Sequence, residues 1–210
     1  MSPSRAGASC LLGVTSNGNT ALHLVASRGH AELAALVCEK EPSLVAARNR
    51  SLDTALHCAA KAGHGEVAAC LLSAMRAGGA DADAALRARN RLGATALFEA
   101  VRNGHAKTVE LLATEAPELA AVTSGDGVSP LYLAAMAESV EMVHALLRQS
   151  PDGTPSRLAG IVRRAGGTDC SACRGGQKRR YGGRTSLRII LKQIRNLHRL
   201  PYSVTANSQL

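Results

Sequence analysis

Aromatic residues are scarce in this chain of 210 residues. It has no tryptophan, one phenylalanine and three tyrosines, so aromatics make up only 2% of the sequence. Hydrophobic residues still reach 46%, so a packed core must be built mainly from alanine, leucine and valine. Alanine has the highest helix propensity and lets helix backbones approach closely, so this composition favours closely packed helices.

Export and membrane signals are also missing. The N-terminus has no basic region followed by a long apolar stretch, the pattern of a secretory signal. No apolar run reaches the roughly 18 residues of a transmembrane helix. Six cysteines in 210 residues are too few for a disulfide scaffold. We therefore expect no transmembrane span and a reducing, cytoplasmic location.

Catalytic motifs are absent as well. The glycine-rich stretch RRAGGTDCSACRGGQ lacks the strand–loop–helix context of a phosphate-binding loop, and no nucleophile motif is present. The single Cys-x-x-Cys pair, Cys170 and Cys173, has no second ligand pair at the spacing of a zinc module. We expect no enzyme activity, no cofactor and no metal site.

Positive charge is concentrated in the C-terminal quarter of the chain. The formal net charge is +9, yet residues 1–156 hold 13 Lys/Arg against 15 Asp/Glu. Residues 157–210 hold 12 Lys/Arg and one acid, Asp169. This asymmetry favours an anionic partner for the tail, with a solvated, disordered tail as an equal alternative.

A sequence motif recurs four times. The four copies are GNTALHLVASRGH at 18–30, LDTALHCAAKAGH at 52–64, GATALFEAVRNGH at 93–105 and GVSPLYLAAMAES at 127–139. Their starts lie 34, 41 and 34 residues apart. The longer interval contains MRAGGADADAALRARN, which predicts a loop insertion of about seven residues on a repeat of about 33 to 34.

Each copy predicts a pair of helices. A hydroxyl residue comes just before the first helix and can cap it, and a glycine ends that helix in three copies. The second helix has apolar residues at three- and four-residue spacing, which predicts one buried stripe. The stripe residues are Leu33, Leu36 and Val37; Val67, Cys70 and Leu71; Val109, Leu111 and Leu112; and Met142, Val143, Leu146 and Leu147.

The pattern T-A-L-H…A-x-x-G-H resembles the ankyrin repeat, whose signature is T-P-L-H-x-A. The resemblance implies an all-α solenoid of helix–turn–helix units with hairpin loops. It also implies a scaffold that binds a partner protein on its concave face. The predicted segments are 1–13 before the repeats, four repeats at 14–150 (about 14–47, 48–88, 89–122 and 123–150), a disordered linker at 151–184, a helix at 185–200 and a tail at 201–210.

A narrower resemblance is carried by AARNRSLDTALHCAAKAGH, the alanine-rich insertion and GVSPLYLAAMAES. These segments are similar to plant ankyrin proteins of the accelerated-cell-death type. That family usually has more repeats and a C-terminal membrane domain with a Pro-Gly-Gly motif, and this chain has neither. The resemblance implies a role in plant stress or defence signalling.

The aligned copies also decide how to interpret a cluster of metal-ligand residue types at 51–72. His57 aligns with His23, Phe98 and Tyr132, and a ligand position would not accept phenylalanine. A ring that packs against the neighbouring repeat explains this set better than a zinc site, which needs a closed set of ligands. His64 lies at the turn between the helices, and Cys58 and Cys70 lie at helical packing positions.

Partner-binding residues are predicted from their positions in the repeat. The resemblance implies binding through the hairpin tips and the exposed side of each first helix. The candidates at these positions are Arg28, Arg50, Asp53, Lys61, Arg91, Arg102, Asn103 and Glu138. Five of the eight are basic, so we expect an acidic partner segment; solvated surface cations are an equal alternative.

The segment TSLRIILKQIRNLHRL at 185–200 predicts a basic amphipathic helix that ends at Pro201. Three interpretations stay open. The helix docks as a cap on the last repeat, it lies on an anionic membrane or binds calmodulin, or the tail derives from a shifted reading frame or alternative exon. Binding to a membrane or to nucleic acid through this tail is the alternative function.

The stretch KRRYGGR at 178–184 adds a nuclear address as a further possibility for the tail. It lacks the interleaved aromatics of single-strand binders, which disfavours nucleic acid as a partner. The alternatives to a cytoplasmic location are therefore the periphery of the plasma membrane and the nucleus.

Overall fold

A computed structural model describes residues 11–77 and 84–148. All of these belong to one compact unit, Met1–Gln177, whereas the second unit, Lys178–Leu210, lies outside the described residues. The predictions for the linker, the amphipathic helix and the tail also lie outside them. The described residues contain helices, turns and one isolated bridge between Val14 and Thr20, which confirms the all-α repeat fold.

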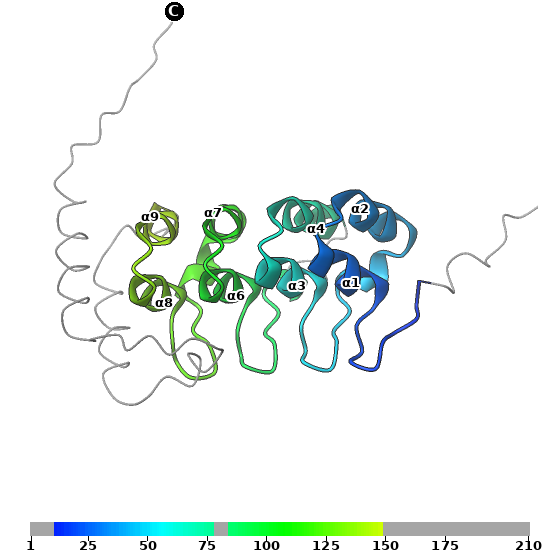
Figure 1. Ribbon diagram of the computed structural model, residues 1–210, viewed down its shortest axis with the longest axis horizontal. Coiled ribbons are helices and arrows are strands. Elements are labelled where there is room, and N and C mark those ends of the chain that lie inside the picture. Colours follow the sequence, from blue (N-terminus) through cyan, green and yellow to red (C-terminus); the bar gives the residue numbers. More distant parts are fainter. Residues whose placement is uncertain (1–10, 78–83, 149–210) are drawn as a thin grey trace, which may run out of the picture. The chain divides into compact units, whose positions relative to one another are not determined.

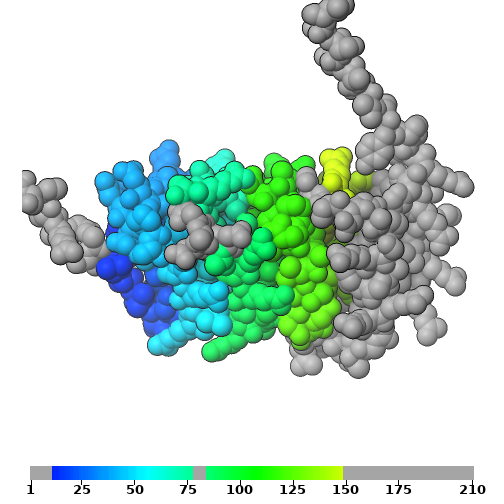
Figure 2. Space-filling view, turned by 180° about the vertical axis from the view of Figure 1, so that it is seen from behind, coloured from blue at the N-terminus to red at the C-terminus, as the bar shows by residue number. Residues whose placement is uncertain are grey.

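The described residues form four helix pairs that stack in two layers (Figure 1). The first helices are α1 (Ala21–Arg28), α3 (Ala55–Ala62), α6 (Ala96–Arg102) and α8 (Pro130–Met136). The second helices are α2 (Ala31–Lys40), α4 (Gly65–Ala77), α7 (Ala106–Glu115) and α9 (Val140–Arg148). Within each layer every helix packs on the corresponding helix of the next repeat, so the repeats appear as successive bands in Figure 2.

The first helices begin where the hydroxyl residues predict. In the third repeat the Thr95 hydroxyl accepts a hydrogen bond from the Phe98 backbone at 3.3 Å, and in the fourth Ser129 accepts one from Tyr132 at 3.1 Å. These bonds satisfy donors that the first turn of a helix otherwise leaves unpaired. In the first two repeats a histidine takes part in the cap instead, as described below.

Glycines end the first helices and leave room for histidine rings. Gly29 and Gly63 have φ angles of 82° and 79°, the left-handed conformation that glycine adopts without steric cost. A Cβ atom on Gly29 would lie 2.7 Å from ring atoms of His64, and one on Gly63 would overlap the His105 ring in the same way. In the second and third repeats, therefore, the turn histidine packs over the glycine of the preceding repeat.

Hairpins connect the repeats and project from the layer of first helices (Figure 1). Asn49 and Asn90 shape two of them, because each side-chain oxygen accepts two backbone N–H groups within its own hairpin. Neighbouring hairpins are joined by single backbone bonds of 2.8 to 3.0 Å. The bonds run from Arg50 N to Asn17 O, from Arg91 N to Ser51 O and from Gly125 N to Leu92 O.

One hairpin residue has an unfavourable backbone conformation. Leu52 has a φ angle of 60° at the position that Gly18, Gly93 and Gly127 occupy in the other hairpins. A non-glycine residue in this conformation costs about 1–2 kcal/mol.

We expect Leu52→Gly to increase the free energy of unfolding by about 0.5 kcal/mol, since relief of strain exceeds the added flexibility of the unfolded chain. Leu92→Gly is the matched control, because Leu92 is also exposed and does not have a positive φ angle. It should decrease the free energy of unfolding. Urea titration of both variants measures the two effects, and a loss of stability in Leu52→Gly would contradict the expectation.

The core lies between the two helix layers, but the stripe predicted for α2 is partly wrong. Leu33 and Leu36 are exposed, whereas Val37 is buried as predicted, together with Ala34 and Cys38. In the later repeats the predicted stripe residues are buried or half-buried. The difference arises because α2 belongs to the first repeat, where the described residues include no preceding repeat to cover its outer side.

The insertion is only partly a loop. Met75, Arg76 and Ala77 belong to α4, which has 13 residues compared with 10 in α2 and α7. Residues 78–83 lie outside the described residues. In the first and third repeats short 3₁₀ helices, η1 (Pro42–Val45) and η2 (Pro117–Ala121), follow the second helix, and each begins with proline. These turns were not predicted.

Candidate partner-binding surface

The ends of the hairpins and the exposed sides of the first helices form one surface, which we call the hairpin face. It is the surface that the sequence predicts as the concave face. The second and third hairpins share the sequence Ala-Arg-Asn-Arg, at 47–50 and at 88–91. All four arginines are exposed. Among residues 11–77 and 84–148, no carboxylate pairs with any of the four guanidinium groups.

The predicted binding residues fall into two groups. Arg28, Asn103 and Glu138 are exposed at the ends of first helices, and Arg50 and Arg91 are exposed at the hairpins. Glu138 occupies the left-handed position that glycine holds in the other repeats, with a φ angle of 55°. The second group, Asp53, Lys61 and Arg102, is brought together inside the hairpin face.

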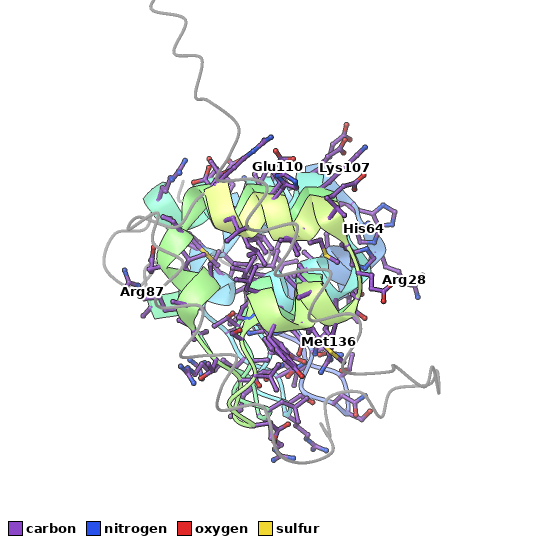
Figure 3. All side chains as sticks on the ribbon, turned by 90° about the vertical axis from the view of Figure 1, so that its left-hand side faces the viewer. Arg28, His64, Arg87, Lys107, Glu110 and Met136 are labelled. Carbon is purple, nitrogen blue, oxygen red and sulfur yellow. The ribbon has the colours of Figure 1, made fainter. Side chains whose placement is uncertain are left out.

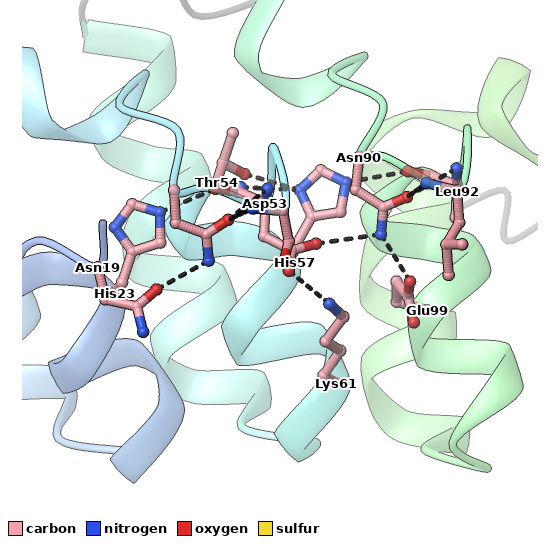
Figure 4. Close-up of polar contacts among 12 residues, drawn as sticks. Asn19, His23, Asp53, Thr54, His57, Lys61, Asn90, Leu92 and Glu99 are labelled. Carbon is pink, nitrogen blue, oxygen red and sulfur yellow. Dashed lines mark hydrogen bonds and ion pairs between the residues drawn. The ribbon is translucent and has the colours of Figure 1, made fainter. Parts of the chain in front are cut away.

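This second group belongs to a network that joins the second and third repeats. Figure 4 shows its members Asp53, Lys61, Asn90 and Glu99. Lys61 Nζ lies 2.6 Å from Asp53 Oδ2. The Asn90 side-chain amide donates to Asp53 Oδ1 at 3.0 Å and to Glu99 Oε1 at 2.7 Å. Arg102 lies 2.6 Å from Glu99 Oε2 in an ion pair. Asp53 and Glu99 are therefore each paired with one cation, and both accept a hydrogen bond from the Asn90 amide.

The network changes which cations are available to a partner. Asp53 and Glu99 are buried, and a buried carboxylate is costly unless it is paired. Lys61 and Arg102 supply those charges and are themselves only partly exposed. The exposed positive charge of the hairpin face therefore comes mainly from the arginines of the second and third hairpins.

Two buried histidines link consecutive repeats in the same way. His57 Nε2 lies 3.1 Å from the Ala94 carbonyl oxygen in the next repeat, and Nδ1 lies 2.9 Å from the Thr54 hydroxyl and 3.2 Å from Thr54 N. A carbonyl only accepts, so Nε2 carries the proton and Nδ1 accepts from Thr54. His23 makes the corresponding bonds to Thr20 and to the Asp53 carbonyl.

Burial keeps both of these rings neutral. Desolvation lowers the pKa of His57 to about 4, against the opposing effects of the Ala94 hydrogen bond and the Asp53 charge. Burial likewise lowers the pKa of His23. The predicted role of His57, a ring that packs against the next repeat, is confirmed. The turn histidine of the third repeat, His105, also reaches the preceding repeat, since its Nε2 lies 3.0 Å from Lys61 O.

The cysteines of the first two repeats are poorly suited to bind metal. Burial raises the pKa of the Cys38 and Cys58 thiols to about 11 and also raises that of Cys70. Thiolate is the form that binds metal. Within the described residues no group of three or more histidine, cysteine, aspartate or glutamate side chains could hold a metal ion. The Cys170–Cys173 pair lies outside these residues.

Arg48, Arg89, Asn90 and Glu99 were missed by the sequence analysis. The recurrence of Ala-Arg-Asn-Arg at the same position of two hairpins could have identified both the arginines and the asparagine. Glu99 had no such signal, because its aligned residues are Leu24, Cys58 and Leu133. It became part of the network only because a cation and an amide lie beside it.

The fold and this surface together define a class of helical repeat protein, in which stacked units present a continuous face. The family model for ankyrin repeats (three copies) matches residues 6–85 and 75–155. The chain belongs to the ankyrin-repeat family. A search of curated proteins gives no match, so no relative supports the narrower resemblance to the accelerated-cell-death type. In the part of the chain that the structure describes, no helix is long and apolar enough to cross a membrane.

Proposed function

We propose that this chain is a non-catalytic protein-binding module that holds an acidic segment of a partner against its hairpin face. The observation that carries the proposal is the set of four exposed arginines, matched in position on two neighbouring hairpins and without carboxylate partners among the described residues. Arginine binds carboxylates through two parallel hydrogen bonds, which gives both affinity and direction. Unpaired like charges repel one another, and an acidic partner removes that cost.

The exposed residues Arg28, Asn103 and Glu138 extend this surface along the first helices. Asp53, Lys61 and Arg102 contribute mainly by holding the second and third repeats in a fixed arrangement, since each bonds within the chain. A preformed surface binds with a smaller loss of conformational entropy than a flexible one.

The experiment compares charge reversal on two surfaces. Arg50→Glu with Arg91→Glu reverses two exposed hairpin charges, and Lys107→Glu with Arg148→Glu reverses two exposed charges on α7 and α9. With a partner identified by proximity labelling of the full chain, we expect the hairpin variant to raise the dissociation constant about tenfold or more. The helix variant should change it little.

Both variants should fold as the wild type does, which circular dichroism checks. The partner's affinity should also weaken with salt for the wild type and less so for the hairpin variant, because exposed charges are screened. Unchanged binding of the hairpin variant at low salt would refute the proposal, as would an equal loss in both variants.

The basic tail supports a second candidate, which is binding to an anionic membrane or to nucleic acid. The supporting observation is the excess of 12 Lys/Arg over one acid in residues 157–210. Binding of the full chain and of a chain ending at residue 156 to anionic vesicles and to duplex DNA tests it. If removal of the tail changes neither, this candidate fails. The narrower family resemblance would place either activity in plant stress or defence signalling, in the cytoplasm, at the plasma membrane or in the nucleus.

A further inference from the structure

One end of the stack has an apolar face. Leu24 of α1 and Leu33 and Leu36 of α2 are 45%, 49% and 50% exposed. The residues aligned with Leu33 are Val67, Thr108 and Met142, which are at most 2% exposed. In the later repeats a preceding repeat covers this position, whereas the described residues include no repeat that covers Leu33. The exposed face of α1 and α2, which we call the end face, therefore has the form of a surface that normally packs against helices.

The charges at the rim of the end face have opposite signs. Arg28 lies one helical turn after Leu24 on α1, and Glu32 lies one turn before Leu36 on α2, so each charge shares a helix face with a leucine. Both charged residues are exposed, and neither forms an ion pair within the described residues. Figure 3 shows Arg28 on the flank of the stack that carries His64, opposite Arg87.

These four residues are arranged symmetrically about the turn between the two helices. Leu24 and Leu36 are equally distant from His30 along the chain, and so are Arg28 and Glu32. Because α1 and α2 are antiparallel, Leu24 lies at the level of Leu36 and Arg28 at the level of Glu32. A two-fold axis that lies between the two helices and parallel to them would pack Leu24 of one copy on Leu36 of the other. The same axis would place Arg28 of one copy beside Glu32 of the other.

We propose that two copies of this chain associate through their end faces, with α1 of each copy packed on α2 of the other. An isologous contact needs a surface that is complementary to itself, and the end face has apolar residues that match across the axis and charges of opposite sign at the rim. The dimer covers α1 but leaves the hairpins of both copies free, so it would present two sets of hairpin arginines to one partner or two partners. Linked binding sites of this kind increase avidity.

Sedimentation velocity of the full chain at 0.15 M salt tests the proposal across a range of protein concentrations. We expect a reversible monomer–dimer equilibrium and no larger species. Leu36→Glu should raise the dimer dissociation constant about tenfold or more, since it places a carboxylate in an apolar contact in both halves of the dimer. Val140→Glu is the matched control, because Val140 is also 50% exposed but lies on α9; it should leave the dimer intact.

A charge exchange tests the two-fold arrangement itself. Arg28→Glu and Glu32→Arg should each weaken the dimer several-fold, and the double exchange should restore it, because the opposite charges again face one another. A chain that is monomeric at all concentrations, a dimer unaffected by Leu36→Glu, or assemblies that grow beyond two copies would each overturn the proposal. So would failure of the double exchange to restore the dimer.

Discussion

Replacement of Gly63 with alanine is expected to lower the free energy of unfolding by about 2–4 kcal/mol. The left-handed backbone conformation alone costs an alanine about 1–2 kcal/mol. The new Cβ atom would also lie 2.7 Å from two carbons of the His105 ring, so the ring must move. Movement of the ring breaks its bond to the Lys61 carbonyl, and a lost hydrogen bond costs about 1 kcal/mol more.

Gly104→Ala is the matched control for this prediction. Gly104 has the same φ angle of 79°, but a Cβ atom there would meet no atom within 4 Å. We expect this variant to lose only the backbone contribution, about 1–2 kcal/mol. Urea unfolding at pH 7 measures both values. Equal losses in the two variants would show that the His105 ring does not pack over Gly63 as described.

A decrease of pH from 6.5 to 5 is expected to remove about 2 kcal/mol of stability through His57 alone. In the folded state the His57 ring is neutral and has a pKa of about 4, whereas in the unfolded chain it takes up a proton near pH 6.5. The stability that the neutral His57 ring contributes is therefore fully present above pH 6.5. It is lost as the pH falls toward 4, at about 1.4 kcal/mol for each pH unit. His23, whose pKa is also lowered, adds to the effect in the same direction.

His57→Phe separates this contribution from other titrating groups. Phenylalanine is found at the aligned position, Phe98, where the preceding threonine caps the helix by itself. The variant loses the bond to the Ala94 carbonyl, so it should be less stable than the wild type at pH 7.5 by about 1–2 kcal/mol. The difference should shrink as the pH falls to 5. A difference that stays constant across this range would contradict the assignment of a neutral buried His57.

The sequence was sufficient to predict the helix pairs because each unit repeats its own start and stop signals. The hydroxyl before each first helix and the glycine after three of the four identify the ends locally, without knowledge of the neighbours. His57 could be interpreted for a similar reason, since its aligned residues include Phe98 and Tyr132. Residues that occupy equivalent positions in several copies are therefore the ones that a comparison of the four copies predicts, including His57, which contacts the next repeat.

Contacts between repeats that are not repeated along the chain could not be predicted in this way. The pairing of Asp53 with Asn90 joins residues 37 positions apart, and nothing in either residue alone indicates it. The helical spacing of Leu33 and Leu36 predicts an apolar stripe correctly, but burial of that stripe depends on whether a repeat lies on its outer side. The insertion posed the same problem, because its first three residues extend α4, a helix that packs against α2 and α7.

Hydrogen–deuterium exchange of the full chain, with and without an identified protein partner, tests the central claim most directly. The account predicts slower exchange on binding at the second and third hairpins, residues 48–53 and 89–94, and in the exposed turns of the first helices. Exchange in α4, α7 and α9 should remain as in the free chain. Protection confined to those second helices, with no change at the two hairpins, would contradict the assignment of the hairpin face as the binding surface.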